Sequence, residues 1–489
     1  MDRRRFLQLG AASPLLLGLG SVAGEARAQQ RQPGNAGSSG NGKARNVIFL
    51  VSDGMSMGTL TAADQYLYWR DERHTHWIDL YMQRDLPVHR GLMDMSSRNA
   101  MVTDSAAAAA SWGCGHRVNN GSVNIGPDDE EYPTILQIAR EAGKATGLVT
   151  TTTVTHATPA GFGANVASRG QEADIAKQYY ERGYDVILGG GNHYFDPERR
   201  DDGEDLYGKF EQAGHEIIRD RDALLALSDS DVGVLGTFSN WHLPYEIDRL
   251  HNEQSKQSVP TLAEMTDAAL QRLNRIGDGF VLQVEGGRVD HAAHGNDLGG
   301  LLFDQLAFDD AIGVALAFQQ EHPDTLVIIT TDHGNANPGF QAGPDLGHGQ
   351  FEKLSRFKGT GLTHIVPELN EEVSRDTIRD RFKETLELEI SDRETDMIYD
   401  FVRGDYELPY HRTNHIRSLV AKVVANHLDF NWIGRSHSAD YVELAATGPG
   451  AEQVGPFTKN TDLHQFMLKA LGIEAVQEAA NRRGVRVFA

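Results

Sequence analysis

Short, continuous apolar runs alternate along the chain with segments in which apolar residues recur every three or four positions. The runs are rich in β-branched residues and predict buried strands, whereas the recurring pattern predicts amphipathic helices. We expect strands at 46–52, 146–152, 184–188, 279–284 and 325–330, and a weaker one at 442–446. The helical patterns lie at 132–141, 173–180, 262–276 and 301–318. This alternation predicts an α/β fold with a mostly parallel central sheet and helices on both faces.

Polar side chains that can bind metals follow four of these strands. Because the site of a parallel sheet forms beyond the carboxyl ends of its strands, we expect them to converge. They are Asp53, then His156 and Thr158, then Glu285, Asp290 and His294, and finally Asp332 and His333. Taken singly, each has a structural explanation, but histidine combined with carboxylates suits zinc. A set of this size predicts more than one ion, and two ions about 4 Å apart can hold both oxygens of a phosphoryl transfer.

The segment 102–110 places a serine directly before the alanines Ala106 to Ala110. Alanine is the strongest helix former, so we expect a helix from about Ser105, and Asp104 and Ser105 are residue types that favour helix starts. An ordinary capped helix explains this segment by itself. A helix N-terminus also attracts anions such as phosphate, which makes Ser105 a candidate reactive hydroxyl.

Charge and composition narrow the class of protein. Of the 489 residues, 69 are acidic and 46 basic, and the net charge of −23 argues against a nucleic-acid partner. Such a charge fits metal binding, secretion or adaptation to salt. Cys114 is the only cysteine, so no internal disulfide forms. No interior apolar run reaches the roughly 20 residues of a membrane span.

The first residues resemble an export signal. Arg3 and Arg4 precede an apolar run at 7–23 and a small-residue cleavage site at 26–28, which is typical of a twin-arginine signal peptide over 1–28. An N-terminal membrane anchor is the alternative, and the short, glycine-interrupted run disfavours it. We therefore expect a bacterial periplasmic or extracellular protein without a stable membrane anchor.

Residues 29–43 are rich in Gly, Ser, Asn and Gln and are typical of a flexible linker, which leaves one main domain at 44–489. Within it, about 340–435 departs from the strand–helix alternation and predicts a helical insertion. This insertion is either a solvated addition without a role at the site, or it caps the site or helps a dimer to form. The loop 237–248, with Trp241 and His242, either contacts leaving groups or simply packs.

Seven ordered motifs resemble those of the alkaline phosphatase family. They are VSDG at 51–54, VTDSAAAAASW at 102–112, THATPAGFGANVASR at 155–169, PTLAEMTDAAL at 260–270, VEGGRVDHAAH at 284–294, TTDHG at 330–334 and SHSADYVELAATGPG at 436–450. The resemblance covers about 44–475 except the insertion. It implies hydrolysis of small-molecule phosphate monoesters through a phosphoserine intermediate, and a homodimer.

The resemblance also implies roles for single residues. Ser105 is the nucleophile, and Arg169 binds two phosphate oxygens. The implied metal ligands are Asp290, His294 and His437 for one zinc, Asp53, Asp332 and His333 (with Ser105) for a second, and Asp53, Thr158 and Glu285 for a magnesium ion. His156 and His291 stand beside the ligands, and these imidazoles leave open whether zinc replaces magnesium. A related phosphodiesterase or phosphomutase, and a non-catalytic phosphate or metal scavenger, are the rival readings.

Overall fold

The computed structural model describes residues 43–83, 87–342 and 348–473. The predicted signal peptide at 1–28 lies outside these residues, and so does the predicted linker at 29–43 except for Lys43. Across the described ranges, no helix combines the length and the apolar character that a membrane crossing requires.

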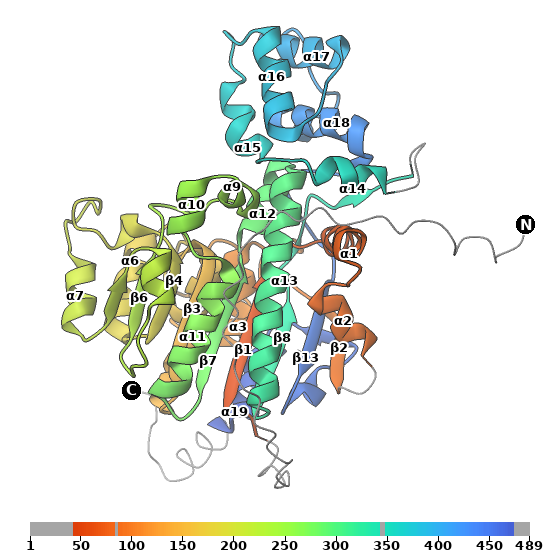
Figure 1. Cartoon of the computed structure of the whole chain (residues 1–489). Coiled ribbons are helices and arrows are strands. Elements are labelled where there is room, and N and C mark those ends of the chain that lie inside the picture. Colours follow the sequence, from red (N-terminus) through yellow and green to blue (C-terminus); the bar gives the residue numbers. More distant parts are fainter. Residues whose placement is uncertain (1–42, 84–86, 343–347, 474–489) are drawn as a thin grey trace, which may run out of the picture. The chain divides into compact units, whose positions relative to one another are not determined.

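A sheet of ten strands, ordered β14-β2-β13-β8-β1-β7-β3-β4-β6-β5, forms the centre of the fold (Figure 1). Most neighbours are parallel, whereas β13 runs antiparallel to both β8 and β2. The strands are β1 (Asn46–Ser52), β2 (Val88–Asp94), β3 (Ala145–Thr153), β4 (Val186–Gly190), β5 (Glu216–Ile218), β6 (Val234–Thr237), β7 (Phe280–Gly286), β8 (Thr325–Thr330), β13 (Val442–Thr447) and β14 (Phe457–Lys459). The predicted α/β fold with a mostly parallel sheet is confirmed.

Helices cover both faces because side chains of the central strand alternate between them. Val47, Phe49 and Val51 enter one core with α3 (Ser105–Cys114), α4 (Ile135–Glu141), α5 (Ala157–Gly163) and α19 (Asp462–Leu471). Ile48 and Leu50 enter the opposite core with α2 (His76–Met82), α11 (Leu262–Ile276) and α13 (Leu298–Glu321). The other helices of the sheet body are α1 (Met57–Asp71), α6 (Glu172–Arg182), α7 (Leu206–Gln212), α8 (Arg221–Leu225), α9 (Glu246–Leu250), α10 (Glu253–Ser258) and α12 (Arg288–Gly295).

The segment between β8 and β13 carries two small antiparallel pairs and a group of helices. The pairs join β9 (Gly334–Asn335) to β12 (His437–Ser438) and β10 (Pro338–Phe340) to β11 (Phe430–Trp432). The helices are α14 (Gly349–Leu354), α15 (Gly361–His364), α16 (Arg375–Leu386), α17 (Asp392–Val402) and α18 (Ile416–Leu428). Their apolar side chains share one core with α1, α12 and α13, so the helical segment packs on the sheet body.

Several predicted bounds agree with the structure, and others shift. The strands at 46–52 and 325–330 and the helix at 262–276 have the predicted limits. Strand β7 continues to Gly286, so Glu285 lies inside this strand instead of after it. Strand β2 was not predicted, because most of its residues are half-buried or exposed and no apolar run marks it.

Candidate metal centre and nucleophile

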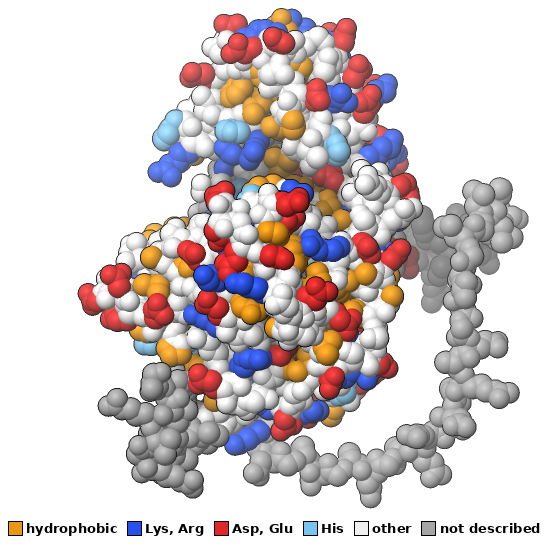
Figure 2. All heavy atoms as spheres, turned by 90° about the vertical axis from the view of Figure 1, so that its left-hand side faces the viewer, with side chains coloured by type: hydrophobic (Ala, Val, Ile, Leu, Met, Phe, Trp, Pro, Cys, Tyr) orange, Lys and Arg blue, Asp and Glu red, His pale blue; other side chains and the backbone are white. Residues whose placement is uncertain are grey.

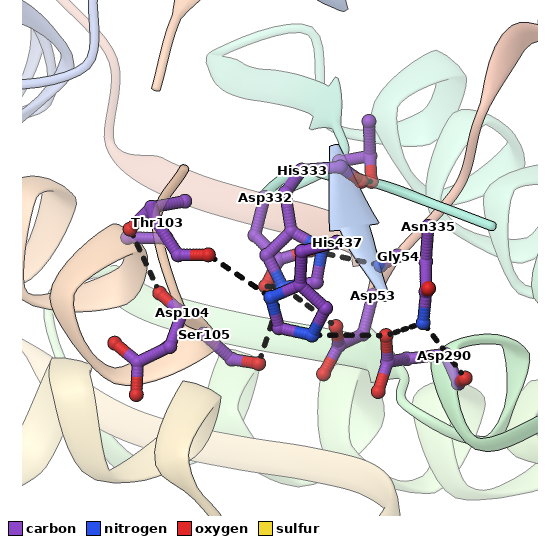
Figure 3. A network of polar contacts seen from close by, with 12 residues as sticks. Asp53, Gly54, Thr103, Asp104, Ser105, Asp290, Asp332, His333, Asn335 and His437 are labelled. Carbon is purple, nitrogen blue, oxygen red and sulfur yellow. Dashed lines mark hydrogen bonds and ion pairs between the residues drawn. The ribbon is translucent and has the colours of Figure 1, made fainter. Parts of the chain in front are cut away.

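Helix α3 begins at Ser105, as the sequence predicts. The Asp104 side chain caps it, with Oδ1 accepting a hydrogen bond from the Ala107 N–H at 3.0 Å, which confirms the predicted capping role. Ser105 is 2% exposed, and its Oγ lies 3.4 Å from Nε2 of His333 (Figure 3). The hydroxyl therefore sits at a positive helix end and faces a candidate metal ligand.

The small residues of α3 also allow very close helix packing. A Cβ at Gly113 would lie 1.8 Å from the carbonyl oxygen of Gly161. A Cβ at Gly161 would lie 2.4 Å from the Cβ of Ala109. The backbones of α3 and α5 are thus in direct contact, and larger side chains would push them apart. This contact fixes Ser105 relative to His156 and Thr158 at the start of α5.

Asp290, His294 and His437 form the first of three groups whose ligand atoms lie within 4.8 Å of one another. Helix α12 places the first two on one face, and the β9–β12 pair brings His437 beside them. Nδ1 of His294 donates to the Arg435 carbonyl at 2.7 Å, and Nδ1 of His437 donates to the Thr103 carbonyl at 2.9 Å. Their Nε2 atoms, 3.0 Å apart, therefore both present lone pairs. Two such lone pairs beside a carboxylate fit a cation.

Asp53, Asp332 and His333 form the second group. Nε2 of His333 lies 3.0 Å from Asp332 Oδ2 and 3.7 Å from Asp53 Oδ1. Asp53 is fully buried, and within the described residues neither carboxylate oxygen has a hydrogen-bond partner. Burial, followed by the charges of Asp332, Asp290 and Glu285, raises the pKa of Asp53 well above its ordinary value. Cations would remove this penalty on the ionised form.

Asp53, His156 and Glu285 form the third group. Oε2 of Glu285 accepts hydrogen bonds from Thr150 and Thr152, whereas Oε1 has no partner among the described residues. Nδ1 of His156 lies 3.9 Å from Oε1. Over the same residues, the fully buried Thr158 hydroxyl has no partner either. The predicted ligands Asp53 and Glu285 therefore lie together, and His156 belongs to the same group, closer than the sequence analysis placed it.

Arg169 faces the site from the loop after α5. Its Nη1 donates to Asp104 Oδ2 at 3.1 Å, and its Nη2 lies 3.1 Å from His156 Nε2. The same Asp104 oxygen accepts from the Gly121 N–H at 3.1 Å. Asp104 thus caps the helix that begins at the candidate nucleophile and orients the Arg169 guanidinium, which links the two groups expected to bind phosphate.

His291 lies in a cluster of imidazoles that the sequence did not predict. Its ring centroid is 5.5 Å from that of His156 and 4.5 Å from that of His242. Arg288 donates to Nδ1 of His291 at 2.8 Å, so the proton of the neutral ring is on Nε2. Burial and then Arg288 lower the pKa of His291, and burial and then His156 lower the pKa of His242 to about 3. His242 is therefore packed at the site, and Arg288 is a site residue that sequence reasoning missed.

Among the described residues, buried carboxylate oxygens without hydrogen-bond donors lie beside histidines, and a serine hydroxyl faces one of these histidines, which fits a hydrolase that binds metal ions. Residues 44–473 match the family model described as alkaline phosphatase. The chain belongs to the alkaline phosphatase family, and as a member it is a metal-binding phosphatase that hydrolyses small phosphate monoesters.

Known relatives support this assignment. Alkaline phosphatase 3 of Bacillus subtilis is 30% identical over 461 residues, which cover 93% of this chain and 94% of that protein. Streptomycin-6-phosphate phosphatase of Streptomyces griseus is 36% identical over 342 residues, 61% of this chain and 75% of that protein. The crystal structure of Thermus thermophilus alkaline phosphatase matches with a TM-score of 0.81 and 33% identity, covering 88% of this chain and 92% of that one.

Proposed function

We propose that the chain hydrolyses phosphate monoesters through a phosphoserine intermediate at Ser105, in a site for two zinc ions and one magnesium ion. The position of Ser105 carries this proposal. Its hydroxyl is buried at a helix N-terminus and faces His333, at the edge of a cluster of carboxylates that lack enough donors within the described chain.

The donor sets fit these ions by their chemistry. One zinc would be held by Asp290, His294 and His437, and the other by Asp53, Asp332 and His333 with Ser105. Asp53, Thr158 and Glu285 offer oxygens that suit magnesium, and Nδ1 of His156 in the same group favours competition by zinc. Bound zinc would lower the pKa of the Ser105 hydroxyl and neutralise the charge of the leaving oxygen.

The side chains then have distinct tasks. Ser105 Oγ forms a bond to phosphorus while the bond to the leaving alcohol breaks. Arg169 binds two of the phosphoryl oxygens, and the free N–H groups at the start of α3 face the same charge. Water next attacks the phosphoserine, the Oγ–phosphorus bond breaks, and inorganic phosphate leaves.

Acid quenching during turnover tests the nucleophile. We expect mass spectrometry to find one phosphate on the peptide that contains Ser105. Ser105→Ala should lose this phosphate and lower kcat/KM by at least about 10³-fold. Ser111→Ala is the matched control, because Ser111 is a buried serine further along the same helix, α3. Turnover that survives Ser105→Ala contradicts the assignment, and a higher kcat/KM for a diester than for a monoester indicates a phosphodiesterase instead.

The twin-arginine pattern at 1–28 supports export to the periplasm or the medium, and family membership supports a homodimer. Loss of extracytoplasmic activity after Arg3→Lys and Arg4→Lys substitution tests the export route. Sedimentation velocity of the mature enzyme tests the dimer, and a monomer at micromolar concentration contradicts it.

A further inference from the structure

The rim beside the first metal group is built by two segments that are distant in sequence. Asn296, just past α12, donates to the Gly434 carbonyl at 2.8 Å and accepts from the Ser418 hydroxyl of α18 at 3.2 Å. These bonds hold the residues before β12 and the start of α18 against the helix that carries Asp290 and His294. The helical segment therefore contributes directly to the surroundings of the site.

Two arginines meet at this rim. Arg435 Nε donates to the His294 carbonyl at 3.3 Å, so its guanidinium lies next to a candidate zinc ligand. Arg417 is on the first turn of α18. Arg417 directly precedes Ser418, and Arg435 directly follows Gly434. The two hydrogen bonds of the Asn296 side chain therefore bring the backbone at both arginines to the same side chain.

Arg417 and Arg435 are half-buried, and they lack the counter-charges that the buried arginines have. Arg200, Arg249 and Arg272 each pair with a carboxylate. Among the described residues Arg417 and Arg435 form no ion pair, and the Nε of Arg417 is buried without a partner. Figure 2 shows Lys, Arg and His side chains along the margin of the helical segment that faces the sheet body. Positive charges that are held close together without a neighbouring carboxylate destabilise the folded state, unless an anion neutralises them.

We propose that Arg417 and Arg435 bind a second phosphate, carried by the leaving alcohol of the substrate. This rests on the proposed function and assigns the leaving oxygen to the zinc that Asp290, His294 and His437 would hold, because the other zinc set includes Ser105. A substituent of that alcohol then extends toward the rim. Guanidinium groups match phosphate oxygens in a planar fork, and a strongly acidic chain needs local positive charge to hold a doubly phosphorylated substrate. The preferred substrates are small alcohols with two phosphate monoesters.

Calorimetry with the Ser105→Ala enzyme, loaded with zinc and magnesium, separates binding from turnover. The probes are propane-1,3-diol bisphosphate and propane-1,3-diol monophosphate. After correction for the two equivalent phosphates, we expect the bisphosphate to bind about tenfold more tightly. Adding Arg417→Gln or Arg435→Gln should remove most of this preference, whereas Arg412→Gln, an exposed arginine before α18, should keep it.

Equal Kd values for the two probes overturn the proposal, and so does a preference that persists in both the Arg417→Gln and the Arg435→Gln protein. The kcat/KM ratio of the two compounds in the Ser105 enzyme must follow the same order. Failure of the proposed function is a separate result, because it appears as turnover by Ser105→Ala whatever the ratio of the Kd values.

Discussion

The two sides of the site use histidine in opposite ways. On one side, the Nε2 atoms of His294, His333 and His437 face carboxylates. The lone pairs and negative charges on this side favour the binding of cations. On the other side, Arg288 holds His291 neutral with its proton on Nε2, and Arg169 lies against His156. The groups around an imidazole ring therefore determine whether the histidine binds a metal or faces an anion. Ser105 lies where the two sides meet.

Breaking the acidic side should have the largest effect. Asp53→Asn removes a carboxylate shared by two ligand groups, and we expect a loss of at least about 10³-fold in kcat/KM together with loss of bound metal. In chelator-treated protein the same change should raise Tm by a few degrees, because it relieves repulsion among Asp53, Asp332 and Glu285. Activity assays and metal analysis measure the expected losses, and thermal melts of the chelator-treated protein measure the expected rise in Tm.

Asp64→Asn is the matched control, because Asp64 is also a buried carboxylate but accepts hydrogen bonds from the Thr75 N–H and hydroxyl. It should lower Tm with and without metal. An Asp53→Asn enzyme with full metal content and unchanged turnover would contradict the role of Asp53.

Arg169→Ala tests the cationic side and should have an intermediate effect. It would remove the two charge-assisted hydrogen bonds that we propose Arg169 makes to phosphate, so we expect kcat/KM to fall about 10²-fold and inhibition by inorganic phosphate to weaken. Arg169→Lys should recover only part of the loss, because lysine lacks the fork. Arg140→Ala, which breaks a peripheral pair with Asp185, should leave both measurements unchanged. Equal inhibition constants in the Arg169→Ala and the original protein would count against this assignment.

A buried imidazole beside the C-terminal part of α3 provides the reference for the smallest effect. His464 on α19 donates to the Trp112 carbonyl at 3.1 Å, and burial lowers its pKa to about 4. The unfolded chain then binds a proton below about pH 6.5 that the folded chain does not. Stability from this residue should therefore be lost as pH falls from about 6.5 to 4, by up to about 3 kcal/mol. His464→Gln should flatten this dependence in denaturant melts, whereas His193→Gln should not; identical slopes for all three proteins would refute it.

Local sequence patterns were sufficient to predict most of the fold. Apolar runs predicted β1 and β8 with their limits, and helical periodicity predicted α11. Positions after strands drew attention to Asp53 and Asp332, because the end of a parallel strand is encoded next to the residue itself. Strand β2 was not predicted, because its half-exposed side chains do not form an apolar run in the sequence.

Contacts between distant segments could not be predicted in this way. His437 was named only through the family resemblance, because the β9–β12 pair that positions it joins residues about 100 apart in sequence. Which ring nitrogen of His156 faces Glu285 depends on the turn that starts α5. The meeting of Arg417 with Arg435 depends on how α18 packs beside α12, and no local pattern encodes that.

The backbone contact between α3 and α5 has a consequence for how the enzyme fails. All ten residues of α3 are buried, and glycines leave no room for this helix to shift. The amide hydrogens after its first turn should then exchange with solvent only when the whole fold opens, among the slowest in the chain. Because Ser105, the proposed nucleophile, begins this protected helix, heating should abolish turnover and native structure at the same temperature.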